Sequence, residues 1–309
     1  MALAQVNSSC RDNRAAISRE RCRTSNCDEH CNLAARKIYL HAWHKTGTFL
    51  VRDLVFGVLK PTCPGFQAQY YADYTGNDVP QCHMAAVVHG NDQFANWFLR
   101  QPAGSVKFAY IMRNPFEMVI STYAYHRSGQ ECNPKTTPMG NRRDKIDMQL
   151  QQRMLRLCAK VAAPAVPNTA VQHTAEYVHR DVLPRIRRVH DRLHGKPSVH
   201  ASRLEDFESD FGQSARRLLQ FVGVSAAHFP RALDRSLSLQ SRSKEVRITH
   251  VNPLKLNSSA RTALLEALLS GPLCSKLQAH ALALGYSSPS CRSKPVVLGP
   301  SSAKAMHDT

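Results

Sequence analysis

The stretch "KIYLHAWHKTGTFLVRDLV", residues 37–55, decides the fold that the sequence predicts. The apolar run Lys37–Ala42 predicts a buried strand, and the apolar spacing over residues 48–59 predicts an amphipathic helix. Between them lies a tight turn, "HKTGT", at residues 44–48. Unpaired N–H groups at a helix N-terminus favour anions, and the turn adds a lysine charge, two hydroxyl donors and a flexible glycine. The pattern indicates a phosphate-binding turn, although an ordinary threonine N-cap would give a similar sequence.

The order of residues in this turn separates it from the Walker A motif of nucleotide triphosphatases. That motif is G-x-x-x-x-G-K-[ST], with glycine directly before lysine. Here Lys45 comes before Gly47, and no glycine lies shortly upstream. The sequence therefore disfavours a nucleotide triphosphatase.

A second stretch, "YIMRNPFEMVISTYAYH" at residues 110–126, carries another potential anion site. It predicts a strand that ends before Arg113 and a helix that begins at Pro115. Ser121 then lies about two turns into the helix, on a face that can look back toward Arg113. A guanidinium fork matches a phosphate, and a serine adds a donor. The alternative is that Arg113 pairs with a nearby carboxylate and Ser121 only fills space.

Strands and helices alternate along the chain. Strand patterns occur at Lys37–Ala42, Met84–His89, Val106–Met112 and, with an acidic exit, in residues 198–207. Helical patterns cover residues 48–59, 91–100, 115–127, 144–161, 171–193, 208–223, 258–269 and 272–284. This alternation predicts an α/β fold of the P-loop-like, three-layer type, with a central parallel sheet flanked by helices. Ligands of such sheets bind at the carboxyl ends of the strands, where both candidate anion sites fall.

Composition limits the organisation and the partners of the chain. The 309 residues carry a net charge of +18, and 43% are hydrophobic, which indicates a globular protein with anionic partners. We expect a poorly ordered leader at residues 1–36, one domain at residues 37–286 and a flexible tail at residues 287–309.

Sorting signals and cysteines give weaker indications. No run of 18 apolar residues predicts a membrane span, and the N-terminus lacks the apolar core of a secretory signal. We therefore expect a cytoplasmic protein with free thiols, and the basic start leaves an organellar transit peptide open. The cluster Cys22, Cys27, His30 and Cys31 does not match paired zinc knuckles, so we expect no metal.

The segments "HKTGT" and "RNPFEMVISTYAYH" together resemble the two cofactor signatures of the sulfotransferase superfamily. Members use 3′-phosphoadenosine 5′-phosphosulfate (PAPS) as co-substrate. The resemblance implies that the 5′-phosphosulfate is bound by Lys45, Thr46, Gly47 and Thr48. It implies that the 3′-phosphate is bound by Arg113 and Ser121. Residues 199–224 and 272–286 are similar to later elements of the family, so the resemblance covers residues 37–286.

Several residues depart from the family pattern. His44 and Phe49 stand where many members have proline and threonine, and Leu50 and Leu204 stand where members have tryptophan and tyrosine. The Arg-Lys-Gly loop of cytosolic members has no clear counterpart. Candidate substitutes for that loop are Arg242, Lys244 and Arg247.

Two residues are predicted to be catalytic. Sulfuryl transfer, like phosphoryl transfer, needs charge neutralised on the leaving oxygen, and Lys45 is the candidate for this role. The acceptor must lose a proton, a task that suits a neutral histidine. The resemblance implies a histidine at a strand end between the signatures, which is His89, with His83 or an acidic residue as alternatives. His44 either assists catalysis or shapes the turn.

Other functions stay open on the sequence alone. One alternative is a P-loop nucleotide kinase, and another is a basic nucleic-acid-binding protein, suggested by "RIRRVHDRLHGK" at residues 185–196. That run has helical spacing typical of a solvated face, so we expect no nucleic-acid partner. The expected acceptor is a small molecule or a glycan with a hydroxyl or amine. Residues 65–76 and the helices after residue 129 are expected to form its pocket.

Overall fold

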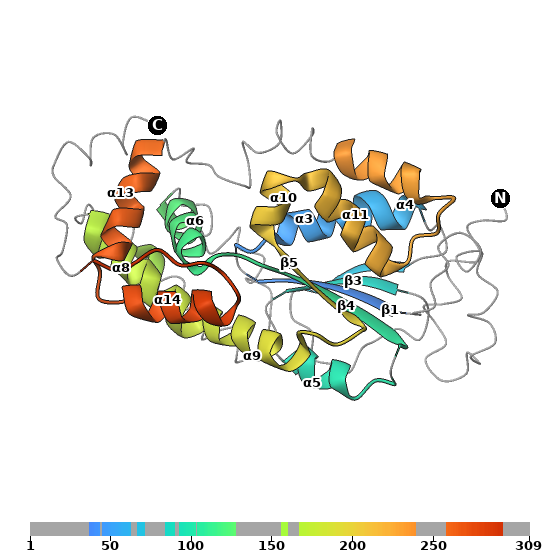
Figure 1. Cartoon of the computed structure of the whole chain (residues 1–309), viewed down its shortest axis with the longest axis horizontal. Helices are drawn as coiled ribbons and strands as arrows, with labels where there is room; N and C mark the ends of the chain where they lie inside the picture. Colours follow the sequence, from blue (N-terminus) through green and yellow to red (C-terminus); the bar gives the residue numbers. More distant parts are fainter. Residues whose placement is uncertain are drawn as a thin grey trace.

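Five parallel strands form the central sheet of the computed structural model (Figure 1). The model describes residues 37–43, 45–62, 67–71, 84–89, 93–102, 104–127, 156–159, 167–238 and 258–292. The strand order is β2-β3-β1-β4-β5, and every neighbouring pair is parallel. The strands are β1 (Lys37–Ala42), β2 (Gln67–Tyr71), β3 (Met84–His89), β4 (Val106–Met112) and β5 (Val199–Arg203).

The strand order creates a switch point between β1 and β4. After β1 the chain continues to β2, which forms one edge of the sheet. After β4 it continues to β5, which forms the opposite edge. Because the two connections diverge, a crevice opens at the carboxyl ends of these two strands, which is the usual ligand site of open α/β sheets. The turn at residues 45–48 follows β1, and Arg113 follows β4. Both predicted anion-binding segments therefore begin at this crevice.

Side chains of β1 alternate between two apolar cores, which explains why helices cover both faces. Ile38 and Leu40 belong to one core, whereas Tyr39 and Trp43 belong to the other. The first core includes residues of α3 (Thr48–Asp53), the π-helical segment η1 (Leu54–Leu59), α10 (Leu204–Ser209) and α11 (Phe211–Val222).

The second core is larger and joins the other face of the sheet to helices that lie partly alongside the sheet and partly beyond the carboxyl ends of its strands (Figure 1). Its helices are α5 (Gln93–Leu99), α6 (Pro115–Arg127), α8 (Pro167–Tyr177), η3 (Val178–Val182), α9 (Leu183–Leu193), α13 (Ser258–Leu269) and α14 (Cys274–Ala283). The predicted α/β fold, a parallel sheet with helices on both faces, is confirmed.

Most predicted elements occur close to their expected bounds, and the omissions are β2 and a helix over residues 229–238. The sequence of β2, "QAQYY", is only five residues long, has two glutamines and no Val, Ile or Leu, and the strand lies at the edge of the sheet. The helix expected at residues 48–59 continues through a π-helical segment to Thr62. Residues 144–155 of another predicted helix lie outside the described residues. Within the described part of the chain, no helix is both long and apolar enough to cross a membrane.

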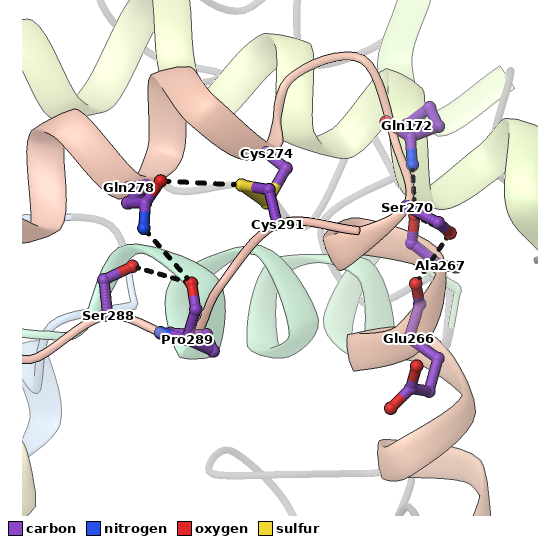
Figure 2. Close-up of a disulfide and its surroundings, with 9 residues drawn as sticks. All are labelled: Gln172, Glu266, Ala267, Ser270, Cys274, Gln278, Ser288, Pro289 and Cys291. Atoms are coloured by element: carbon purple, nitrogen blue, oxygen red, sulfur yellow. Dashed lines mark hydrogen bonds between the residues drawn. A yellow bond between two sulfur atoms is a disulfide. The ribbon is translucent and has the colours of Figure 1, made fainter. Parts of the chain in front are cut away.

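The expectation of free thiols is wrong for three cysteines. Cys274, the first residue of α14, forms a disulfide with Cys291, and their Cα atoms lie 5.8 Å apart (Figure 2). Cys158 is also disulfide-bonded. The sequence could not reveal the pairing, because it arises where the segment after α14 folds back along that helix. In that segment, Gln278 Nε2 donates to the Pro289 carbonyl at 3.5 Å, and the Arg292 N–H donates to the Leu269 carbonyl at 2.8 Å. Residues 287–292 of the expected flexible tail are thus attached to α13 and α14.

Candidate active site

The turn after β1 is closed by hydrogen bonds to Trp43. The Thr46 hydroxyl accepts a hydrogen bond from the Trp43 N–H at 2.7 Å. The hydroxyls of Thr46 and Thr48 lie 3.1 and 3.2 Å from the Trp43 carbonyl oxygen and donate to it. Thr46 is fully buried. The Thr46 hydroxyl therefore fixes the shape of the turn rather than pointing into open space. His44 lies outside the described residues.

Two residues of the turn have unusual backbone conformations. Lys45 has φ of 61° and Gly47 has φ of 105°, both in the left-handed region. Gly47 also lies against the end of β5, since a Cβ at this position would be 3.2 Å from Leu204 Cδ1. The first N–H groups of any helix have no intrahelical acceptor. In α3 the N-cap residue is Gly47, which has no side chain that could accept from them. This is the geometry in which a helix start binds an anion.

The Lys45 side chain extends from the turn toward α6. Its Nζ atom lies over the Tyr125 ring, 2.6 Å from the ring centroid. Tyr125 is four residues after Ser121, so the two side chains share one face of α6, about one turn apart. Ser121 itself is buried. The Lys45 side chain therefore contacts α6 about one helical turn from Ser121.

Arg113 joins the turn after β1 to the end of β4. Its Nη1 donates to the Lys45 carbonyl oxygen at 3.3 Å, and its Nη2 lies 3.9 Å from Glu208 Oε1. The Arg113 Nε is buried and has no hydrogen-bond partner among the described residues. A buried guanidinium donor without an acceptor is unfavourable, so this atom is suited to an incoming anion.

A cavity of about 360 Å³ lies beside Arg113 and Ser121. The structure thus brings these two predicted site residues to one cavity. Its other lining residues are Glu117, Ile120, Glu205, Glu208 and Arg261. With two arginines and three glutamates, the lining carries one more negative than positive formal charge. An anion can bind there only if some of the carboxylates leave their arginines.

Glu205 is the carboxylate held most firmly in this cavity. Its Oε1 accepts from the Asn114 N–H at 2.8 Å, and its Oε2 accepts from the Tyr286 hydroxyl at 3.3 Å. Burial raises the pKa of Glu205, while the Asn114 hydrogen bond and the Arg113 charge act in the opposite direction. Burial, and then the Glu205 charge, raise the pKa of Tyr286. Tyr286 thus stays a hydrogen-bond donor and fixes Glu205 at the end of β5.

His89 is the last residue of β3, and its Cα pairs in register with Ala42 at the end of β1. Its backbone therefore lies at the same edge of the sheet as the lysine turn. The alternative base, His83, lies outside the described residues, as do the candidate substitutes for the Arg-Lys-Gly loop, Arg242, Lys244 and Arg247. The cluster between Cys22 and Cys31 is likewise outside them.

Sequence reasoning assigned no role to Tyr125, Glu117 or Arg261. The spacing of Tyr125 from Ser121 was a usable signal, because residues four apart on a helix are neighbours. Glu117 has the same spacing before Ser121, so its position in the cavity could also have been expected. Arg261 gave no such signal, because it comes from α13, far along the chain.

Solved sulfotransferase structures resemble this chain at low similarity. Mouse sulfotransferase SULT7A1 complexed with PAP has 16% identity, covers 69% of this chain and 69% of its own, and gives a TM-score of 0.40. A sulfotransferase from Alicyclobacillus acidocaldarius has 13% identity, covers 81% of this chain and 96% of its own, and gives a TM-score of 0.41. No protein-family model and no curated protein matches the chain. With TM-scores below 0.5, these likenesses carry no weight for function, which has to come from the residues of the site.

Proposed function

We propose that this chain is a sulfotransferase that moves a sulfuryl group from PAPS to a hydroxyl or amine acceptor. The observation that carries the proposal is the meeting of two anion-binding features at the β1–β4 crevice. Arg113, beside the cavity that Ser121 lines, donates to the Lys45 carbonyl in the glycine-containing turn. A ligand with two separate anionic groups, one for each feature, suits this arrangement.

Each residue of the site has a proposed role. The first-turn amides after Gly47, together with Lys45 and Thr48, bind the 5′-phosphosulfate, and Thr46 holds the turn through its bonds to Trp43. Arg113 and Ser121 bind the 3′-phosphate. The unpartnered Arg113 Nε supports this role, because a phosphate oxygen would supply the acceptor that it lacks.

The proposed reaction is an in-line transfer. The acceptor oxygen or nitrogen forms a new bond to sulfur while the bond from sulfur to the bridging oxygen of PAPS breaks, and 3′,5′-adenosine bisphosphate (PAP) leaves. The Lys45 ammonium neutralises the charge that grows on the bridging oxygen. His89 accepts the proton that the acceptor loses, and its position at the end of β3 supports this assignment.

The acceptor class is proposed more broadly. The net charge of +18 favours acceptors that carry negative charge, such as an acidic glycan, whereas a small alcohol, phenol or amine needs only the pocket. The disulfides bear on the compartment, because such bonds persist mainly in oxidising compartments. They weigh against the cytoplasmic location expected from the sequence.

A transfer assay tests the proposal directly. Purified protein is incubated with PAPS and with separate panels of phenols, amines and glycans, and PAP and the sulfated product are quantified by mass spectrometry. We expect PAP and product to appear in equal amounts with at least one acceptor class. Phosphoryl transfer from ATP, with no PAP formed in any panel, would instead support the nucleotide kinase alternative.

A further inference from the structure

The cavity beside Arg113 is lined by a second arginine, Arg261, which has no role in the proposed function. Arg261, on α13, forms an ion pair with Glu117 in the first turn of α6. Both side chains line the cavity together with Arg113 and Ser121. Two guanidinium groups, one from the segment after β4 and one from α13, thus border one space, and a carboxylate lies near each of them.

The glutamates of the cavity differ in how they are held. Glu205 is fixed at both oxygens, by the Asn114 N–H and the Tyr286 hydroxyl. Glu208 is 54% exposed and lies 3.9 Å from Arg113, beyond hydrogen-bond distance. Glu117 pairs with Arg261 near the cavity surface, since half of the Arg261 side chain is exposed. Glu208 can therefore turn toward solvent, whereas Glu205 stays. Glu117, whose side chain is 23% exposed, can leave only by breaking its pair with Arg261.

A phosphate has the charge and geometry to replace these two carboxylates. A guanidinium binds carboxylate and phosphate in the same bidentate manner, so the Glu117 carboxylate occupies a place at Arg261 that a phosphate oxygen would take. Glu208 lies 3.9 Å from Arg113 and leaves the hydrogen-bond positions there open. Ion pairs near the surface contribute little to stability, so opening them costs little. With Glu117 and Glu208 turned away, Arg113, Arg261 and Glu205 leave a net formal charge of +1 at the cavity, whereas the full lining carries −1. The change favours the binding of a phosphate.

We propose that Arg261 is a second guanidinium ligand of the phosphate that Arg113 and Ser121 bind, and that Glu117 competes with this phosphate for Arg261. The inference rests on the proposed function, since it assigns the ligand as the 3′-phosphate of PAPS or PAP. It makes Arg261 a specificity residue, because a nucleotide without a 3′-phosphate gains nothing from it.

Isothermal titration of the full chain with two nucleotides tests the inference. PAP carries the 3′-phosphate and adenosine 5′-phosphate lacks it. We expect Arg261→Met to weaken PAP binding about tenfold and leave adenosine 5′-phosphate binding unchanged, as for the loss of one charge-assisted contact. Arg261→Lys should recover part of the loss, because it restores the charge without the fork. Glu117→Gln should bind PAP more tightly than the unaltered chain.

The chain offers a closely matched control. Arg292 pairs with Glu266 near the end of α13, and their side chains are 54% and 25% exposed, against 50% and 23% for Arg261 and Glu117. Neither control residue lines the cavity. Arg292→Met and Glu266→Gln should therefore leave the binding of both nucleotides unchanged, while removing an ion pair of the same kind.

Each result separates the inference from the function on which it rests. Equal PAP affinity for the unaltered chain and Arg261→Met would overturn the role of Arg261. Weaker PAP binding by Glu117→Gln would overturn the competition. No PAP binding by the unaltered chain would overturn the proposed function itself. Equal melting temperatures of Arg261→Met and Arg292→Met would show that a binding difference between them does not come from unfolding.

Discussion

The Lys45 ammonium lies over the ring of Tyr125, 2.6 Å from its centroid. This contact links the turn after β1 to α6, the helix that also carries Ser121. It holds a full positive charge beside an aromatic face, where cations are attracted by the ring quadrupole. The two phosphate features proposed for PAPS are thus joined by a side-chain contact as well as by the Arg113 bond to the Lys45 carbonyl.

Lys45→Met should reduce sulfuryl transfer by ~10²-fold or more, because it removes the charge that neutralises the leaving oxygen. Tyr125→Phe is the matched variant, since it keeps the aromatic face and should keep most of the activity. Turnover with saturating PAPS measures both. Activity of Lys45→Met within a few fold of the unaltered chain would remove Lys45 from the chemistry.

His89→Ala should lower turnover by ~10²-fold or more without changing the affinity for PAP, because it removes the proposed general base and leaves the cofactor contacts intact. Steady-state turnover and PAP titration, carried out on the same preparation, separate these effects. His83→Ala is the comparison variant and should stay active. Full activity of His89→Ala together with loss in His83→Ala would transfer the role to His83.

Gly47→Ala should destabilise the fold and weaken PAP binding, because the new Cβ meets Leu204 Cδ1 at 3.2 Å and the φ of 105° is strained for alanine. Gly195→Ala isolates the contact, since Gly195 has φ of 80° but nothing within 4 Å of its added Cβ. We expect Gly195→Ala to cost about 1 kcal/mol from backbone strain alone and Gly47→Ala to cost more.

Chemical denaturation measures the two costs, and the double variant Gly47→Ala/Leu204→Ala tests their origin. If Leu204 is the obstacle, shortening it should restore part of the loss caused by Gly47→Ala. Equal costs for the two glycine variants would show that the approach of Leu204 is unimportant.

Cys274→Ser should lower the free energy of unfolding by about 2–4 kcal/mol, as is typical when a disulfide that closes a loop of this size is lost. The disulfide joins residues 17 positions apart, and the loop that it closes contains Tyr286, which holds Glu205. Denaturation of the oxidised chain, the reduced chain and the variant measures the effect. The variant should match the reduced chain only if Cys158 contributes little. Alkylation of Cys274 and Cys291 in unreduced protein would contradict the disulfide.

The fold was largely predictable because its strands carry their own signals. The apolar runs of β1, β3 and β4 give the parallel sheet, and the turn after β1 has a sequence that only a few local structures suit. Strand β2 was not predicted because it is an edge strand of only five residues, and "QAQYY" contains two glutamines and no Val, Ile or Leu. Local patterns therefore identified the interior strands and the edge strand β5, but not the opposite edge strand β2.

The site was predictable only in part. Arg113 follows β4 and Ser121 lies two turns into the next helix, α6, so their spacing in the sequence indicated that both could line one cavity. Arg261 and Tyr286 reach that space from distant segments through tertiary packing, which no local pattern encodes. The disulfide Cys274–Cys291 was missed for the same reason.

Thermal unfolding with added nucleotides tests the central claim most directly. The full chain is heated alone, with PAP, with ATP and with duplex DNA, each at the same ionic strength. Binding at 100 times the dissociation constant stabilises a protein by about 2.7 kcal/mol, which is a shift of roughly 5 °C or more at this size. A two-phosphate site for PAPS predicts this shift with PAP and none with DNA or ATP. A shift with ATP and none with PAP would contradict the account.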